Sequence, residues 1–183
     1  VGGSSTTRYC KISHNGSVGV GGADGSTIQR CTIVSNNLRQ FRPDVHAGGI
    51  KTYGGIWGDI QCTVESNEVA WNWGAGIWFD MCDQEGPIHV RNNYVHDNQT
   101  IPTTKYTCQG MPGILIEISQ NASVYNNLVV SNYNGIMADG SDNVSLFNNT
   151  IVGCRGYGAI LVINDTRRPS CTNNVVMNNI VCN

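Results

Sequence analysis

Three acidic side chains stand at the same place in three copies of one short motif. Each copy opens with glycine and isoleucine and closes with an acid: Gly76–Asp80, Gly113–Glu117 and Gly135–Asp139. If the copies pair as neighbouring strands, their carboxylates lie about 5 Å apart. Carboxylates at that spacing can share a proton, bind a cation such as Ca²⁺ or act as an acid and a base. Asp80, Glu117 and Asp139 are therefore candidate catalytic residues, and Asp80 and Glu117 are candidate metal ligands.

An earlier copy of the motif, Gly49–Tyr53, supplies a basic residue, Lys51. His46 lies four residues before the isoleucine of this copy. Alternation along a strand turns Lys51 to the same outward face as the acids. Lys51 or His46 could act as the base that removes the proton next to a uronate carboxylate, the first step of lyase and epimerase chemistry.

Aromatic residues accompany the same motifs. Tyr53 ends the first copy, Trp78 lies inside the next one, and Trp73 precedes that copy at the position that His46 has in the first. Aromatic faces beside carboxylates and a cation suit a sugar polymer, so these three residues are candidates for substrate binding. The alternative is a sheet face without function, because Trp78 and Leu115 would also suit a solvated face or one beneath an inserted loop such as residues 99–109.

These motifs belong to a longer repeat. Seven segments begin with Asn or Cys, have Ile or Val two residues later, and start 21, 36, 26, 34, 22 and 30 residues apart. The shortest spacings indicate a coil of about 22 residues, and the longer ones indicate inserted loops. Because the same residue types recur in register, a parallel solenoid is favoured over a sandwich. The expected inward column is Ile12, Ile33, Val69, Val95, Val129, Ile151 and Val181, with the asparagines stacked as a ladder at a turn.

The segments Val90–Asn98 and Val124–Asn132, each followed by a Gly-Ile strand, resemble the right-handed parallel β-helix repeat of the pectate-lyase-like superfamily. The resemblance implies an all-β, single-stranded right-handed parallel β-helix of about seven coils with inserted loops. The resemblance covers residues 1–183 as a single β-helix domain, which is either a whole domain or a fragment of a longer solenoid. Activity does not follow, because the superfamily contains lyases, hydrolases, epimerases and non-catalytic members. The adjacent Asp-Asp, Gly-His-Gly and Arg-x-Lys motifs of polygalacturonase-type hydrolases are missing from the sequence.

Eight cysteines without a C-x-x-C pair predict disulfides and a secreted protein. Cys10 and Cys31 occupy the same position in successive coils, at a separation that a disulfide can bridge. Cys82 and Cys108 flank an inserted loop and form the second expected pair. Unpaired stacking of Cys10 and Cys31 as small core residues remains the alternative.

The amino-acid composition excludes some classes of binding partner for this protein. Charged residues make up 13% of the chain, which also contains 22 glycines and has a net charge of −2, so nucleic acid is an unexpected partner. No apolar run is long enough to cross a bilayer, so no membrane span is expected. Six Asn-x-Ser/Thr sequences are candidate glycosylation sites: Asn15, Asn98, Asn121, Asn143, Asn148 and Asn164.

Two functions are compatible with this pattern. The first is an extracellular enzyme with a carbohydrate-facing surface, acting on an acidic polysaccharide as a lyase, an epimerase or a hydrolase. The second is a non-catalytic structural or adhesive solenoid, a cell-surface or filament-forming subunit that stacks end to end by self-association. Solenoid ends need capping, and stacked ends can cap each other. The aromatic and acidic columns favour the carbohydrate-facing surface, with a polysaccharide or another glycan as the partner.

Overall fold

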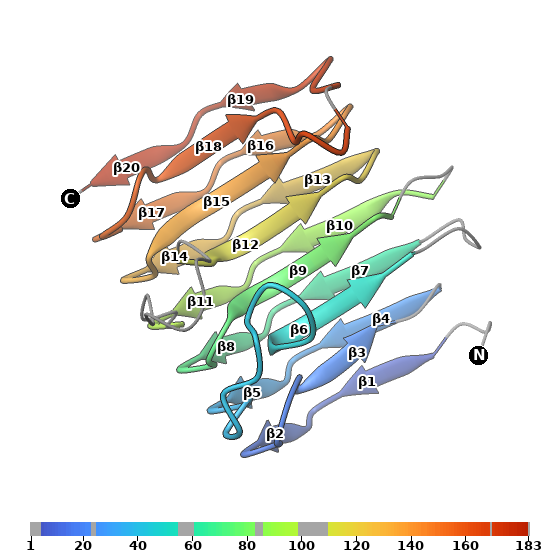
Figure 1. Ribbon diagram of the computed structural model, residues 1–183, viewed down its shortest axis with the longest axis vertical. Helices are drawn as coiled ribbons and strands as arrows, with labels where there is room; N and C mark the ends of the chain where they lie inside the picture. Colours follow the sequence, from blue (N-terminus) through green and yellow to red (C-terminus); the bar gives the residue numbers. More distant parts are fainter. Residues whose placement is uncertain are drawn as a thin grey trace.

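The computed structural model describes residues 5–22, 25–54, 61–82, 86–98, 110–168 and 170–182. Within these ranges the chain forms short strands and turns without helices, and the paired strands run parallel in three sheets (Figure 1). No helix in the described part of the chain could cross a membrane. The parallel solenoid predicted from the repeat is confirmed.

Each sheet takes one strand from each turn of the solenoid. Sheet A contains β1 (Thr6–Arg8), β4 (Ser26–Gln29), β7 (Cys62–Glu65), β10 (Ile88–Arg91), β13 (Ala122–Tyr125), β16 (Ser145–Phe147) and β19 (Val175–Met177). Sheet B contains β2 (Lys11–Ser13), β5 (Thr32–Val34), β8 (Glu68–Ala70), β11 (Tyr94–His96), β14 (Leu128–Val130), β17 (Thr150–Val152) and β20 (Ile180–Cys182). Sheet C contains β3 (Val20–Gly22), β6 (Gly48–Tyr53), β9 (Ala75–Asp80), β12 (Pro112–Glu117), β15 (Asn134–Asp139) and β18 (Ile160–Ile163).

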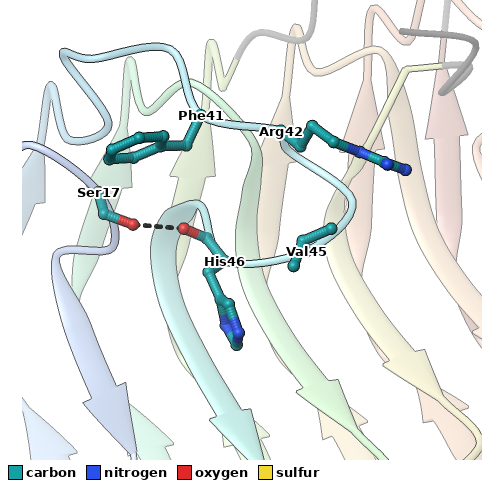
Figure 2. Close-up of a pocket in the computed structure, with 5 residues that line it drawn as sticks. All are labelled: Ser17, Phe41, Arg42, Val45 and His46. Carbon is teal, nitrogen blue, oxygen red and sulfur yellow. Dashed lines mark hydrogen bonds between the residues drawn. The ribbon is translucent and has the colours of Figure 1, made fainter.

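A long loop, residues 35–47, joins β5 to β6 and lies in front of β6 (Figure 1). Asn37 braces it, because its side chain accepts a hydrogen bond from the Phe41 amide and donates one to the Phe41 carbonyl, both 2.9 Å. Ser17 holds the far end by donating to the His46 carbonyl (Figure 2). The loop is therefore fixed against sheet C.

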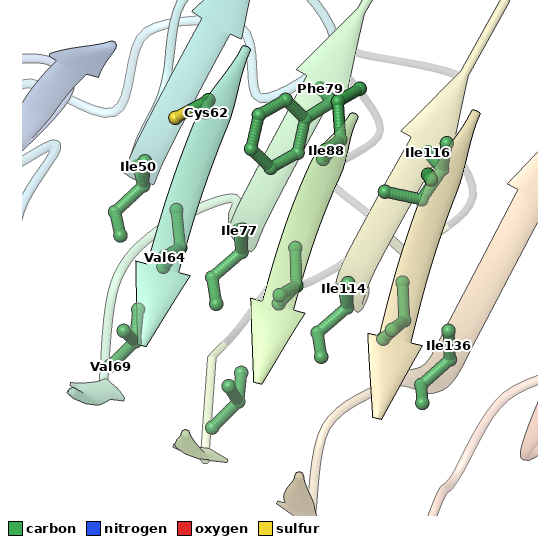
Figure 3. Close-up of a cluster of buried hydrophobic side chains, with 14 of the residues drawn as sticks. Ile50, Cys62, Val64, Val69, Ile77, Phe79, Ile88, Ile114, Ile116 and Ile136 are labelled. Carbon is green, nitrogen blue, oxygen red and sulfur yellow. The ribbon is translucent and has the colours of Figure 1, made fainter. Parts of the chain in front are cut away.

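The core is a set of stacked apolar columns. The predicted column from Ile12 to Val181 is found in sheet B, where each member pairs with the next. Sheet C contributes Ile50, Ile77, Ile114 and Ile136, which face side chains of sheets A and B (Figure 3). Full burial of each such side chain is worth about 1.5–3 kcal/mol. Because similar apolar contacts recur from coil to coil in these columns, they set the register of the strands.

Two asparagine ladders run along the solenoid, one on each side of sheet B. Asn93 accepts a hydrogen bond from the Asn67 amide and donates to Asn127 Oδ1, both at 3.0 Å, and it also donates to the Val64 carbonyl at 2.9 Å. An amide side chain suits this position because it is both donor and acceptor. The two ladders consist of Asn67, Asn93, Asn127, Asn149 and Asn179, and of Asn15, Asn36, Asn72, Asn98 and Asn132. The predicted ladder is confirmed.

The expected disulfides are not supported. Cys10, Cys31 and Cys82 are free thiols, and each donates a hydrogen bond to the carbonyl two residues before it. The thiols thus turn back onto their own strands. Burial raises the pKa of Cys31 and raises that of Cys82 to about 12, which disfavours the thiolate form of both. Cys108, the expected partner of Cys82, lies outside the described residues.

One glycosylation candidate conflicts with the fold. Asn98 is 2% exposed, and its Nδ2 donates to the Val69 carbonyl at 2.9 Å and to Asn132 Oδ1 at 3.2 Å. A glycan on that nitrogen would break the ladder, so the prediction for Asn98 is wrong in the folded chain. The other candidates are exposed, and their glycosylation stays a prediction: Asn15, Asn121, Asn143, Asn148 and Asn164.

Candidate active site on sheet C

The three predicted acids lie side by side. Asp80 of β9 pairs with Glu117 of β12, which pairs with Asp139 of β15. Tyr53 of β6 pairs with Asp80 on the other side, and Ile163 of β18 continues the column beyond Asp139. The register derived from the repeat is confirmed residue by residue.

The surface around Trp78 is not the open patch that the sequence predicts. Trp78 is 2% exposed and Leu115 4%, and both pack with Met111 in a small apolar cluster outside the main core. The prediction of an exposed tryptophan platform is therefore wrong. Met111 and Leu115 pack with the Trp78 ring and the Lys51 ammonium lies over it, so the alternative of a covered face is the correct one for Trp78.

Lys51 is buried in an ion pair. Its Nζ lies 3.0 Å from Asp80 Oδ2 and 3.3 Å from the centre of the Trp78 ring, and it donates to the carbonyl of Val45 in the 35–47 loop. Both Lys51 and Asp80 are more than nine-tenths buried. An acid, a carbonyl and an aromatic face enclose the ammonium, so Nζ is not free to approach a substrate, and this environment disfavours Lys51 as the base of a lyase or an epimerase.

The other predicted residues lie outside this arrangement. His46 is exposed and lines a separate pocket of about 430 Å³ with Ser17, Phe41, Arg42 and Val45 (Figure 2). Trp73 is half-buried in the turn before β9, where its amide donates to the Asn36 carbonyl at 3.0 Å. Tyr53 is 54% exposed at the end of β6. The structure therefore brings together the acids, Lys51 and Trp78, but not His46.

A third acid joins Glu117 and Asp139 in a cluster that the sequence did not predict. Carboxylate oxygens of Glu117, Asp139 and Asp165 lie within 4.8 Å of one another. Asp165 lies in the turn that follows β18, two residues after Ile163. In β18 the position of the acid column is occupied by Ile163 instead of an acid. An acid two residues beyond that position is the sequence feature that could have located Asp165.

Arg167 clamps this cluster. Its Nη2 contacts Glu117 Oε1 and lies 2.6 Å from Asp165 Oδ2, while its Nε lies 3.0 Å from Asp165 Oδ1. The second oxygen of Glu117 accepts a hydrogen bond from Trp78 Nε1 at 2.9 Å. Glu117 and Asp165 are therefore both fixed in place, whereas Asp139 Oδ1 is buried without a hydrogen-bond partner in the described part of the chain.

The environment raises the pKa of two acids in this cluster and lowers that of the third. Burial, with the charges of Asp165 and Glu117, raises the pKa of Asp139 to about 6. Burial also raises the pKa of Glu117, against the hydrogen bonds from Arg167 and Trp78. The hydrogen bond from Arg167 lowers the pKa of Asp165. A protonated Asp139 thus lies beside an ionised Asp165 in weakly acidic solution.

The cluster opens into a small pocket of about 120 Å³. Its apolar lining is formed by Trp78, Met111, Leu115 and Met137, and Asp44 from the 35–47 loop adds another acid. We name this hollow, with Glu117, Asp139 and Asp165, the acid pocket. Its apolar walls account for the burial that raises the pKa of Asp139.

The predicted Ca²⁺ ligands do not form a suitable site. One oxygen of Asp80 is held by Lys51, and both oxygens of Glu117 are held by Arg167 and Trp78. Glu117, Asp139 and Asp165 are close enough to share a cation, but the Arg167 guanidinium already pairs with two of them. The donor set therefore does not fit Ca²⁺, and no step of the chemistry below involves a metal.

Parallel register, three sheets and asparagine ladders define a parallel β-solenoid, here with a carboxylate pocket on one sheet. A family model described as right handed beta helix region matches residues 1–111 and 55–183. The chain belongs to this right-handed β-helix family. Neither curated proteins nor solved structures gave a match.

Proposed function

We propose that the protein hydrolyses glycosidic bonds at the acid pocket. The observation that carries this proposal is the pairing of Asp139, whose pKa is raised to about 6, with Asp165, whose pKa is lowered, at an oxygen separation below 4.8 Å. Glycoside hydrolysis requires one protonated and one ionised carboxyl group, and environments that separate two pKa values identify the pair.

The short separation favours the retaining reaction, in which the two carboxyl groups lie about 5 Å apart. Asp139 gives its proton to the oxygen of the leaving sugar as the glycosidic bond breaks. Asp165 attacks the anomeric carbon and forms a glycosyl ester. Asp139, now ionised, takes a proton from water, and the resulting hydroxide displaces Asp165. Both carboxyl groups return to their starting states.

The neighbouring residues position this pair. Arg167 holds Asp165 ionised and oriented through three contacts, and Glu117 fixes Arg167 from the other side. Trp78 in turn fixes Glu117. The apolar walls half-bury Asp139, which favours its protonated form over its ionised form.

The charge of the pocket favours a neutral glycan over the acidic polysaccharide expected from the sequence. Four carboxylates lie at the site, those of Asp44, Glu117, Asp139 and Asp165, against two guanidinium groups: Arg42 pairs with Asp44, and Arg167 pairs with Glu117 and Asp165. A uronate would meet like charges, because the Lys51 ammonium is buried against Asp80. Secretion remains part of the proposal on the glycosylation sequences alone, because the described cysteines are free thiols.

The test is the release of reducing ends from neutral polysaccharides and from polygalacturonate. Wild type should act on a neutral substrate, and Asp139→Asn and Asp165→Asn should each lose about a hundredfold or more of that activity. Glu65→Gln, which breaks an ion pair with Arg91 on sheet A, is the matched control and should keep it. Equal rates for wild type and Asp139→Asn would refute the proposal.

A further inference from the structure

Sheet B carries an exposed aromatic surface of the kind that sheet C lacks. Trp71, Tyr94 and Leu128 are 52%, 40% and 41% exposed. Tyr94 pairs with Leu128 on the next strand, and Trp71 directly follows β8 on the strand before. We name these residues, with His96, the sheet B patch.

His96 holds the two rings of this patch in place. It is 5% exposed, its ring stacks on Tyr94 with centroids 4.0 Å apart, and it meets Trp71 edge to face at 4.9 Å. Carboxylates lie at both imidazole nitrogens: Asp97 Oδ2 is 2.9 Å from Nδ1 and Glu68 Oε1 is 3.5 Å from Nε2. The aromatic surface is thus ordered before any ligand arrives, which reduces the entropic cost of binding.

Trp71 lies at a turn whose backbone is left-handed in coil after coil. Its φ is 52°, a left-handed conformation that is unfavourable for a bulky side chain. The same turn position holds Ser35, Asp97 and Ser131 in other coils, with φ of 56°, 50° and 53°. Each of these residues donates its amide to the next coil, as Trp71 does to His96. The fold therefore sets the backbone of this turn, and what distinguishes Trp71 from the other copies is its large ring, which is half exposed.

We propose that the sheet B patch binds a glycan without acid groups. Sugar C–H faces would pack on Trp71 and Tyr94, and hydroxyl groups would donate to the carboxylates of Glu68 and Asp97, whose side chains are 39% and 37% exposed. The same carboxylates repel uronates. The patch lies on a different sheet from the acid pocket, so it binds glycan independently of hydrolysis.

The repeat itself supplies variants that the fold accepts. Trp71→Ser introduces the residue that Ser131 places at this turn, and Tyr94→Leu introduces the residue that Leu128 places on the next strand. Calorimetric titration with cellohexaose, chitohexaose and hexagalacturonate measures binding. Wild type should bind cellohexaose or chitohexaose but not hexagalacturonate, and each variant should weaken binding about tenfold, which corresponds to the loss of one ring contact.

Two comparisons separate this site from the acid pocket and from general effects. Tyr9→Ala removes an aromatic residue that is 65% exposed elsewhere and should bind like wild type. Trp71→Ser should weaken binding by the same factor whether or not Asp139→Asn has disabled the proposed hydrolysis. Thermal unfolding should show Trp71→Ser to be at least as stable as wild type. The proposal would be overturned if Trp71→Ser kept wild-type affinity, or if the wild type bound only hexagalacturonate or none of the probes. A change in oligomeric mass caused by Trp71→Ser would also overturn it, because the patch would then contact a protein partner.

Discussion

Trp78 Nε1 donates a 2.9 Å hydrogen bond to Glu117 Oε2 on the neighbouring strand. The ring of the same tryptophan faces the Lys51 ammonium at 3.3 Å. One buried side chain therefore joins the Lys51–Asp80 ion pair to the acid pocket. The tryptophan that the sequence marks as a sugar platform acts instead as a structural link between charged groups.

Trp78→Phe should impair catalysis without unfolding the protein. Phenylalanine retains most of the apolar ring but cannot donate to Glu117, so the pKa of Glu117 should rise further and its hold on Arg167 should weaken. A hydrogen bond to a charged group is worth about 1.5–3 kcal/mol, so kcat/KM on a neutral glycan should fall about tenfold or more. Unchanged kinetics in a folded variant would contradict this role.

Lys51→Met should destabilise the fold strongly, because it leaves Asp80 buried without its cation. Removing one partner of a buried ion pair costs about 3–5 kcal/mol. The double variant Lys51→Met/Asp80→Leu replaces the pair with apolar groups and should recover most of that loss. Urea unfolding of the two variants and wild type measures this, and a single variant within about 1 kcal/mol of wild type would show that the pair is not effectively buried.

Asn127→Ala should interrupt an asparagine ladder. Its side chain accepts from the backbone amide and Nδ2 of Asn93, and it donates to the Val90 carbonyl and to Asn149 Oδ1, all within 2.9–3.0 Å. Losing these bonds in a buried site should cost about 3 kcal/mol or more. Ser123→Ala, on the half-exposed outer face of sheet A, should change the unfolding free energy by less than about 0.5 kcal/mol. Equal effects of the two substitutions would argue against the ladder.

The fold could be read from the sequence because a solenoid repeats its constraints. Each coil places isoleucine or valine and asparagine at the same positions, so the strand register follows directly from the spacing. The pairing of Asp80 with Glu117 and of Glu117 with Asp139 needed no further information.

The acid pocket could be predicted only in part, because loops complete it. Nothing in the repeat indicates that Met111 lies against Trp78 or that Val45 caps Lys51. Asp165 and Arg167 lie in a turn outside the strand pattern. Whether an outward side chain is open or covered depends on how such loops fold back, and periodicity carries no information about that.

Asp139 should make the stability of the protein depend on pH. Its pKa rises from 3.8 to about 6 on folding, so the folded state binds the proton more tightly. The unfolding free energy of wild type should therefore fall as pH increases from about 4 to about 6, and the raised pKa of Glu117 adds to this trend. Asn does not ionise, so the unfolding free energy of Asp139→Asn should not fall in this way. At pH 7 the variant should be more stable than wild type by about 1 kcal/mol, allowing for solvent screening of a half-buried group. Parallel stability curves for the two proteins would contradict the raised pKa.

The pH dependence of kcat/KM on a neutral glycan tests the proposed chemistry most directly. Asp139 must be protonated to act as the acid, so wild-type activity should decline at alkaline pH with an apparent pKa near 6. The charge of Glu117 contributes to that value, so Glu117→Gln should shift the decline to lower pH. Absence of turnover in wild type, or the same alkaline decline in both proteins, would contradict the assignment of Asp139 as the general acid.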